Sequence, residues 1–254
     1  MSKTVVVLDP GHGGYDPGAV YHGLQEKELN LKLALLVAER LSGVKVLLTR
    51  ERDQFVSLAD RVAFSNLAGA DLFVSLHANA GGGRGFESFV YRGLKEGAEA
   101  VGMQRSLHQK IMEALSPWQI VDRGMKRAAF YVLRFNERPA VLIESLFIDN
   151  EREAALWRDR RLVEALAGGV VRGIEEALGV LPLEATPGDR SPGPMRGYHT
   201  GAPGAERQGE DETGQVLYTV QVGAFAYLEN ARQRLAEAQE AGFEDAYIYR
   251  KAVE

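Results

Sequence analysis

The stretch Val5-Val6-Val7-Leu8-Asp9-Pro10-Gly11-His12-Gly13-Gly14, near the start of the chain, decides the fold. Its apolar run is typical of a buried β-strand, and the strand is expected to stop at Pro10, which has no backbone N–H to donate. The glycines that follow tolerate backbone angles that other residues resist. Because open α/β sheets bind their ligands at the carboxyl ends of the strands, His12 is a candidate ligand of a catalytic metal.

Apolar runs and helical periodicities alternate along the first 181 residues. Strands are predicted at 3–9, 44–48, 71–76, 85–91, 130–133 and 140–145, and helices at 27–41, 54–68, 95–115, 150–157 and 159–178. The glycine-rich residues 10–25 are expected to form a loop. This alternation predicts an α/β fold in which a mostly parallel, twisted sheet carries helices on both faces.

Three segments are expected along the chain. Residues 1–181 are predicted to form a single catalytic domain, and residues 182–215, rich in proline, glycine and charge, a flexible linker. Residues 216–254 are predicted to form a small βαβ segment, with strands at 216–222 and 246–249 and a helix at 227–241. A segment of this size has little core of its own.

The composition excludes some chemistries and partners. The chain of 254 residues has no cysteine, which rules out thiolate metal sites and cysteine nucleophiles. Its net charge is −5 with both signs spread along the sequence, which argues against nucleic acid as a partner. No apolar run is long enough to span a membrane. Because Met1 leads almost directly into the first strand, we expect no signal peptide and synthesis in the cytoplasm, unless a leader has been removed.

Three polar residues lie at strand ends that a parallel sheet would bring to one edge. His12 follows the first predicted strand, His77 follows a later one, and Glu144 ends another. Two histidines and one carboxylate form a normal catalytic zinc set, in which the fourth position is left for water. A further carboxylate within reach could then act as a general base.

The identity of the carboxylate ligand stays open on these grounds. Glu26, at the start of the first helix, and Asp16, in the loop that carries His12, are rivals, and Glu26 could simply complement the helix dipole. Asp9 is expected to orient His12, as partners of metal ligands commonly do. Glu144 lies in an apolar run, so it could instead be the salt-bridge partner of an arginine. The two histidines could each be structural.

Six motifs occur in order along residues 3–178: Leu8-Asp9-Pro10-Gly11-His12-Gly13-Gly14, Asp16-Pro17-Gly18-Ala19, Glu26-Lys27 with Asn30-Leu31, Leu48-Thr49-Arg50, Phe73-Val74-Ser75-Leu76-His77-Ala78-Asn79-Ala80 and Leu142-Ile143-Glu144. Together they closely resemble those of the zinc-dependent N-acetylmuramoyl-L-alanine amidases. The resemblance implies a zinc ion held by His12, Glu26 and His77, with Glu144 as the catalytic glutamate, and it favours Glu26 over Asp16. It also implies the substrate, which is the peptidoglycan amide between the lactyl group of N-acetylmuramic acid and L-alanine.

Other residues carry weaker expectations. Asn79 and Arg50 are candidates for orienting a ligand or contacting substrate, and Arg50, Arg61 and Arg123 could each serve packing or bind substrate carboxylates. Near the C-terminus, Tyr218-Thr219-Val220-Gln221-Val222-Gly223-Ala224-Phe225 resembles the start of a SPOR domain. That resemblance implies binding to the glycan strands of peptidoglycan, although the sequence holds only about the first half of such a fold.

Two other functions remain to be weighed against a cell-wall amidase. One is a catalytically silent protein that binds peptidoglycan on the same fold and regulates other enzymes. The other is a zinc peptidase or deacetylase that acts on a different substrate. For an amidase, the physiological setting could be autolysis, sporulation or phage lysis, and this choice rests on analogy alone.

Overall fold

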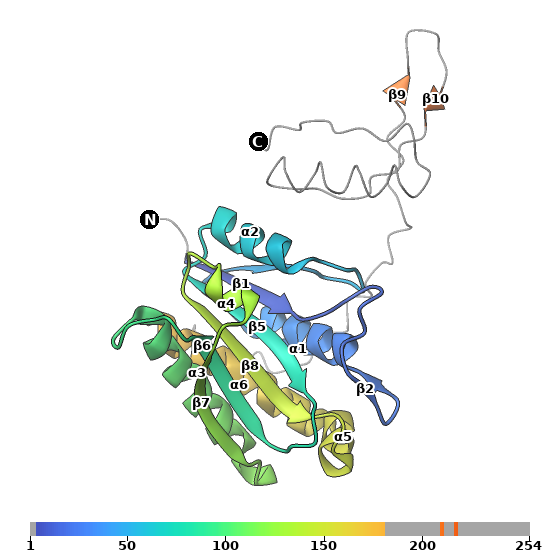
Figure 1. Cartoon of the computed structure of the whole chain (residues 1–254), viewed down its shortest axis with the longest axis vertical. Helices are drawn as coiled ribbons and strands as arrows, with labels where there is room; N and C mark the ends of the chain where they lie inside the picture. Colours follow the sequence, from blue (N-terminus) through green and yellow to red (C-terminus); the bar gives the residue numbers. More distant parts are fainter. Residues whose placement is uncertain (1–3, 181–208, 211–215, 218–254) are drawn as a thin grey trace, which may run out of the picture. The chain divides into compact units, whose positions relative to one another are not determined.

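The computed structural model describes residues 4–180, 209–210 and 216–217 (Figure 1). Outside the large domain, the short strands β9 (Gly209–Glu210) and β10 (Val216–Leu217) pair with each other in antiparallel fashion. Most of the expected linker at 182–215 and of the βαβ segment at 216–254 lies outside the described residues. The division into three segments therefore stays a prediction.

A six-stranded sheet forms the centre of the large domain, with the strand order β4-β1-β5-β8-β6-β7. In that order the strands are Lys45–Leu48, Val5–Pro10, Leu72–Asn79, Ala140–Phe147, Phe86–Tyr91 and Asp122–Ala128. All neighbouring pairs are parallel except β6 and β8, which are antiparallel. The prediction of a mostly parallel sheet is confirmed.

Helices cover both faces of the sheet, but unequally (Figure 1). The larger core lies under α1 (Glu26–Arg40), α3 (Glu99–Leu115) and α6 (Arg160–Leu178) and receives Val6 and Leu8 of β1. The smaller core lies under α2 (Leu58–Ala68) and α4 (Tyr131–Arg134) and receives Val7. Side chains of a strand alternate between faces, so the wholly apolar run of β1 is explained by burial on both. The remaining helix, α5 (Glu151–Arg158), buries Trp157 in the larger core.

The prediction of a strand at 130–133 is wrong, because α4 occupies these residues. Val132 and Leu133 bury themselves in the smaller core as one helical turn, and a short apolar run does not distinguish a strand from a helix by periodicity. In the central sheet, sequence reasoning missed β7, whose residues are charged and largely exposed. An edge strand has one unpaired side, and charged side chains are usual there.

Two further boundaries affect the functional site. The stretch 10–25, expected to be a loop, contains a hairpin of β2 (Val20–Tyr21) and β3 (Leu24–Gln25). His22 and Gly23 form its turn, with φ values of 50° and 71°, as a two-residue hairpin requires. The strand expected at 71–76 continues to Asn79, so His77 lies within β5 rather than after it. No helix in the described part of the chain is long and apolar enough to cross a membrane.

Candidate active site

His12 lies directly beyond β1, in a backbone conformation that is unusual for its type. Its φ is 60°, in the left-handed region that residues other than glycine seldom occupy. Such strain persists where the surroundings hold it, and here Arg61 Nη2 donates a hydrogen bond of 2.8 Å to the His12 carbonyl. Glycine is required at position 11 because a Cβ there would lie 2.1 Å from His77 Cε1. The end of β1 therefore packs directly against the second histidine.

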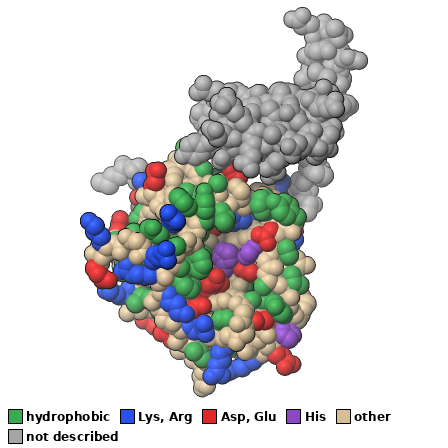
Figure 2. Space-filling model, viewed as in Figure 1, with side chains coloured by type: hydrophobic (Ala, Val, Ile, Leu, Met, Phe, Trp, Pro, Cys, Tyr) green, Lys and Arg blue, Asp and Glu red, His purple; other side chains and the backbone are tan. Residues whose placement is uncertain are grey.

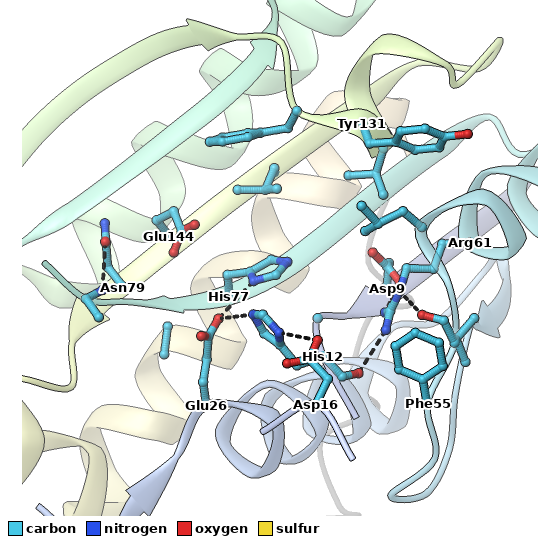
Figure 3. A pocket seen from close by; sticks show the side chains of 18 residues that line it. Asp9, His12, Asp16, Glu26, Phe55, Arg61, His77, Asn79, Tyr131 and Glu144 are labelled. Carbon is cyan, nitrogen blue, oxygen red and sulfur yellow. Dashed lines mark hydrogen bonds and ion pairs between the residues drawn. The ribbon is translucent and has the colours of Figure 1, made fainter. Parts of the chain in front are cut away.

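Glu26 places a carboxylate between the two histidine rings. The hairpin ends at Gln25, so Glu26 is the first residue of α1. Its Oε1 lies 3.2 Å from His12 Nε2 and 2.9 Å from His77 Nδ1. One ligand atom from each of the three side chains lies within 4.8 Å of the others, so the group could hold a metal ion (Figure 3). We call His12, Glu26 and His77 the donor cluster.

Hydrogen bonds from neighbouring groups hold the side chains of the donor cluster in position. His12 Nδ1 donates to Asp16 Oδ2 at 2.8 Å, which leaves Nε2 turned toward Glu26. The backbone N–H of Ala19 donates to Glu26 Oε2 at 3.0 Å, and Asn30 Nδ2 donates to Oε1 at 3.4 Å. A carboxylate behind a ligating histidine is a usual arrangement in metal sites. Of the two rivals, Glu26 therefore occupies the inner position and Asp16 the outer one.

The charges of the donor cluster depend on one another. Burial alone would lower the pKa of His12, but the hydrogen bonds and charges of Glu26 and Asp16 outweigh it and raise that pKa to about 9. Burial of His77 is likewise outweighed by Glu26 and Glu144, so its pKa is raised. Burial would raise the pKa of Glu26, yet the two histidines lower it strongly. Without a metal, the ionised Glu26 therefore favours protonated histidines, and a bound cation would displace those protons.

Glu144 is a carboxylate beside the donor cluster that has no partner of its own in the part of the chain that the structure describes. In the register of β5 and β8 it stands opposite His77, and both side chains project into the same cavity (Figure 3). It makes no hydrogen bond or ion pair with any residue that the structure describes, so the arginine salt bridge considered above is not found there. Burial raises its pKa to about 7, although the charge of His77 acts in the opposite direction. A carboxyl group that titrates near neutrality can both accept and return a proton.

A cavity of about 510 Å³ opens over the donor cluster and Glu144. Its other walls are mainly apolar and come from the segments before and within α2 and α4: Phe55, Val56, Leu58, Phe130, Tyr131 and Val132. Figure 2 shows histidine and acidic side chains in a hollow that hydrophobic side chains border. Apolar walls with a few convergent polar groups are typical of a substrate site.

Asp9 does not orient the His12 ring, contrary to the expectation from the sequence. Its carboxylate accepts hydrogen bonds from Thr49 Oγ1 at 2.6 Å, Arg61 Nη1 at 2.7 Å and Ser75 Oγ at 2.7 Å. Burial would raise the pKa of Asp9, but the charge of Arg61 and these hydrogen bonds lower it. Because Arg61 also holds the His12 carbonyl, Asp9 supports His12 through the backbone.

Arg50 and Asn79 take different roles in the structure. Arg50 is only 1% exposed and donates to the backbone carbonyls of Pro10, Gly11 and Lys27. Of the two roles left open for Arg50, packing is the one that this position allows. Asn79 lines the cavity, and its Nδ2 donates to Glu87 Oε1 at 2.7 Å.

A second histidine centre lies away from the cavity. On α3, His108 places Nδ1 2.9 Å from Ser88 Oγ and Nε2 2.9 Å from Asp122 Oδ1. These are the residue types of a hydrolase triad, but Ser88 is fully buried and no substrate could reach it. The group instead satisfies buried polar atoms between α3, β6 and β7.

The fold and the site together define the chain as an α/β protein with the donor set of a metal-dependent hydrolase. Residues 6–176 match the family model described as N-acetylmuramoyl-L-alanine amidase, and residues 214–253 match the model of the SPOR domain. The chain therefore belongs to the N-acetylmuramoyl-L-alanine amidase family, as the motifs predicted.

Relatives and solved structures agree with this assignment. The sporulation-specific N-acetylmuramoyl-L-alanine amidase of Bacillus subtilis (strain 168) is 38% identical over 247 residues, which covers 96% of this chain and 84% of the relative. The endolysin of Bacillus phage SPP1 is 44% identical over 182 residues, or 70% of this chain and 67% of the relative. The catalytic domain of CwlV, an N-acetylmuramoyl-L-alanine amidase from Bacillus (Paenibacillus) polymyxa var. colistinus, matches with a TM-score of 0.65 and 33% identity over 70% of this chain and 99% of that one. The expected enzyme activity, hydrolysis of a cell-wall amide, is confirmed.

Proposed function

We propose that the donor cluster holds a catalytic zinc ion and that Glu144 is the general base for hydrolysis of the amide between N-acetylmuramic acid and L-alanine. Two nitrogen donors and one carboxylate oxygen converge within 4.8 Å, and this set and number suit zinc with one position left open. The carboxylate of Asp16 behind His12 supports the same assignment. When bound, zinc would supply Lewis acidity that activates water near neutral pH and stabilises negative charge on a carbonyl oxygen.

The protein's own residues account for the proton transfers. In its ionised form Glu144 removes a proton from the attacking water, and in its protonated form it returns that proton to the departing nitrogen of L-alanine. Burial raises the pKa of Glu144 above the usual range of a glutamate, which favours the proton uptake and return that the two steps need. The apolar walls of the cavity hold the substrate away from bulk water, which strengthens the electrostatic interactions inside.

The observation that carries this proposal is the partly buried carboxyl group of Glu144 next to the donor cluster, which has no hydrogen-bond or ion-pair partner among the described residues. The Glu144→Gln variant is expected to retain one zinc ion per chain and the wild-type melting temperature, but to lose about 10³-fold in the rate of peptidoglycan hydrolysis. Glu113→Gln on the exposed face of α3 is the matched control, and it should hydrolyse at the wild-type rate.

Chemical labelling of the amines released from purified peptidoglycan tests the bond that is cleaved. We expect the new free amine to belong to L-alanine. A free amine on a sugar would instead indicate a deacetylase, and one on another amino acid a peptidase. Wild-type hydrolysis by Glu144→Gln would remove Glu144 from the mechanism.

We also propose that the segment matched at 214–253 binds glycan strands, so that peptidoglycan contacts the chain through both its stem peptides and its glycan. Co-sedimentation with purified peptidoglycan, for the whole chain and for a chain ending at Val180, tests this binding. Equal retention of the two chains would contradict it.

The relatives named as a sporulation-specific amidase and an endolysin support a setting in which lysis brings the enzyme to the wall. We therefore propose cytoplasmic synthesis followed by release on lysis. Fractionation of producing cells should then find the activity inside intact cells, whereas activity in the medium before lysis would contradict the proposal.

A further inference from the structure

A row of polar side chains crosses three strands of the sheet and continues outward from the site. In the strand register His77 of β5 stands opposite Glu144 of β8, and Glu144 stands opposite Glu87 of β6. Directly paired residues project from the same face of a sheet, so all three side chains lie on the face that bears the cavity. The next strand outward is β7, the charged edge strand.

Two cations of β7 are organised around Glu87. Its Oε2 accepts a hydrogen bond of 3.0 Å from Arg123 Nε and another from Lys126 Nζ. Its Oε1 accepts a hydrogen bond from Asn79 Nδ2. Burial would raise the pKa of Glu87, but these three hydrogen bonds lower it, so the carboxylate is ionised at neutral pH. One anion and two cations leave the group with a net charge of +1. We call Glu87, Arg123 and Lys126 the cationic rim.

The cationic rim has donors that its own carboxylate does not use. The Arg123 and Lys126 side chains are 32% and 39% exposed, whereas the other arginines beside the site, Arg50 and Arg61, are buried and bonded to backbone carbonyls. Among the described residues, Arg123 Nη2 has no hydrogen-bond acceptor. The guanidinium lies 4.8 Å from the centre of the Phe147 ring, which fixes its plane and reduces the entropy lost on binding.

The direction of the reaction decides which half of the substrate meets the cationic rim. This step rests on the proposed function, in which Glu144 returns a proton to the nitrogen of L-alanine. The peptide that begins with this nitrogen must therefore leave the site on the Glu144 side. Strands lie about 4.8 Å apart, so β7 lies about 10 Å beyond β8. A peptide extends by about 3.5 Å per residue, so the second or third residue of the stem reaches the rim.

We propose that Arg123 and Lys126 bind a carboxylate of the stem peptide. They would make the enzyme prefer stems whose second residue is linked onward through its side chain and keeps a free α-carboxyl group over stems in which that group is amidated. A guanidinium and an ammonium group both donate to carboxylates, and the planar guanidinium can do so in bidentate fashion. The buried carboxylate of Glu87 sets the positions of both cations before the substrate arrives, which lowers the cost of binding.

Two soluble muropeptides with tripeptide stems test the proposal, one with the α-carboxylate of the second residue and one with the carboxamide. The wild-type enzyme should show kcat/KM about tenfold higher for the carboxylate substrate, which corresponds to 1.4 kcal/mol. In the Arg123→Gln/Lys126→Gln variant the ratio should fall to about one, mainly because KM rises for the carboxylate substrate alone. The ratio does not depend on the fraction of folded enzyme, so partial loss of folding leaves the test valid.

Arg127→Gln is the matched control, because Arg127 is the next residue of β7 and bonds Leu94 and Glu96 instead of Glu87. It should keep the tenfold ratio. High salt should reduce the wild-type preference and leave the rate on the carboxamide substrate unchanged, since exposed charges are screened. A wild-type ratio near one, or a double variant that keeps the preference, would overturn the proposal. Failure of the wild type to cleave either substrate would instead overturn the proposed function.

Discussion

Two kinds of ionisable side chain line the cavity, and the fold treats them in opposite ways. Asp9 and Arg61, which we call the buried pair, are 1% and 3% exposed and have all the partners described above. Glu144, which is only partly buried, has no hydrogen bond among the described residues and faces the cavity. Charges that serve the fold are paired within it, whereas the carboxyl group of Glu144, for which we propose a change of protonation state, has no partner among the described residues.

The donor cluster lies between these extremes. Its members are paired with one another. However, the two nitrogens and one oxygen that these contacts join are also a donor set that suits a metal ion. Removing a side chain from each group should therefore have a different consequence. Loss from the donor cluster should affect activity, and loss from the buried pair should affect stability.

The largest effect is expected from His77→Ala. Without one nitrogen donor the cluster should fail to hold zinc, and the rate of peptidoglycan hydrolysis should fall by at least about 10³-fold, because a bound metal supplies several kcal/mol of charge stabilisation. Metal content by mass spectrometry and hydrolysis rates measure the two effects together. Removing zinc from the wild type with a chelator should give the same loss, and adding zinc should restore activity to the wild type alone.

His22→Ala is the control for this prediction. His22 lies at the tip of the β2–β3 hairpin and is exposed, so its loss should leave zinc content unchanged. A His77→Ala variant that keeps a full complement of zinc would show that the donor cluster is not the metal site.

The next effect in size concerns Arg61→Ala, which leaves the carboxylate of Asp9 buried without its charged partner. Breaking a buried ion pair from one side costs about 3–5 kcal/mol, and the free energy of unfolding should fall by that amount in urea denaturation. Arg160→Ala is the control, because Arg160 forms a solvent-exposed ion pair with Glu164, and such pairs contribute little to stability. Equal losses in the two variants would show that burial of the pair does not matter.

The fold was largely predictable from the sequence, and each exception has a physical cause. Runs such as Val5–Leu8 are apolar throughout because both faces of the central strands are buried, and such runs are recognised without further information. β7 was missed because an edge strand needs no apolar residues, and its position depends on pairing with β6, far away in the sequence. α4 was mistaken for a strand because four apolar residues contain no measurable period.

Within the candidate site, the sequence indicated which residues gather but not what each one touches. His12, His77 and Glu144 could be found because each was expected at the end of a strand, and a parallel sheet brings the carboxyl-terminal parts of its strands together. The partners of Asp9 and Asp16 could not be found, because they depend on side-chain directions that the register alone does not set. Glu87 could have been found by the same signal as Glu144, because it is a carboxylate within a largely apolar strand. The sequence analysis did not identify it as a candidate.

A smaller effect is expected from Asp16→Asn, which replaces the carboxylate behind His12 with an amide. Partners of this kind change metal affinity by about 10- to 100-fold, so the dissociation constant for zinc, measured by competition with a chelating dye, should rise by that factor. The hydrolysis rate at saturating zinc should change much less. Asp71→Asn, at the opposite end of β5, is the control and should leave zinc affinity unaltered.

The smallest effect concerns the pH dependence of the buried pair, which Asp9→Asn isolates. The pKa of Asp9 is lower in the folded protein than its usual value, because Arg61 and the hydrogen bonds of Thr49 and Ser75 outweigh burial. The unfolded chain therefore takes up this proton at a higher pH than the folded one does. The contribution of ionised Asp9 to stability is complete above the unfolded pKa of about 3.9 and is lost as the pH falls below it.

The difference in unfolding free energy between wild type and Asp9→Asn should accordingly be constant from pH 7 to about pH 5 and should narrow between about pH 4 and pH 3. Urea denaturation at each pH measures this difference, and since both proteins share every other titrating group, the narrowing can be assigned to Asp9. A difference that stays constant down to pH 3 would mean that the hydrogen bonds of an uncharged Asp9 suffice, and that the charge of the buried pair contributes nothing to the stability of the strand end that carries His12.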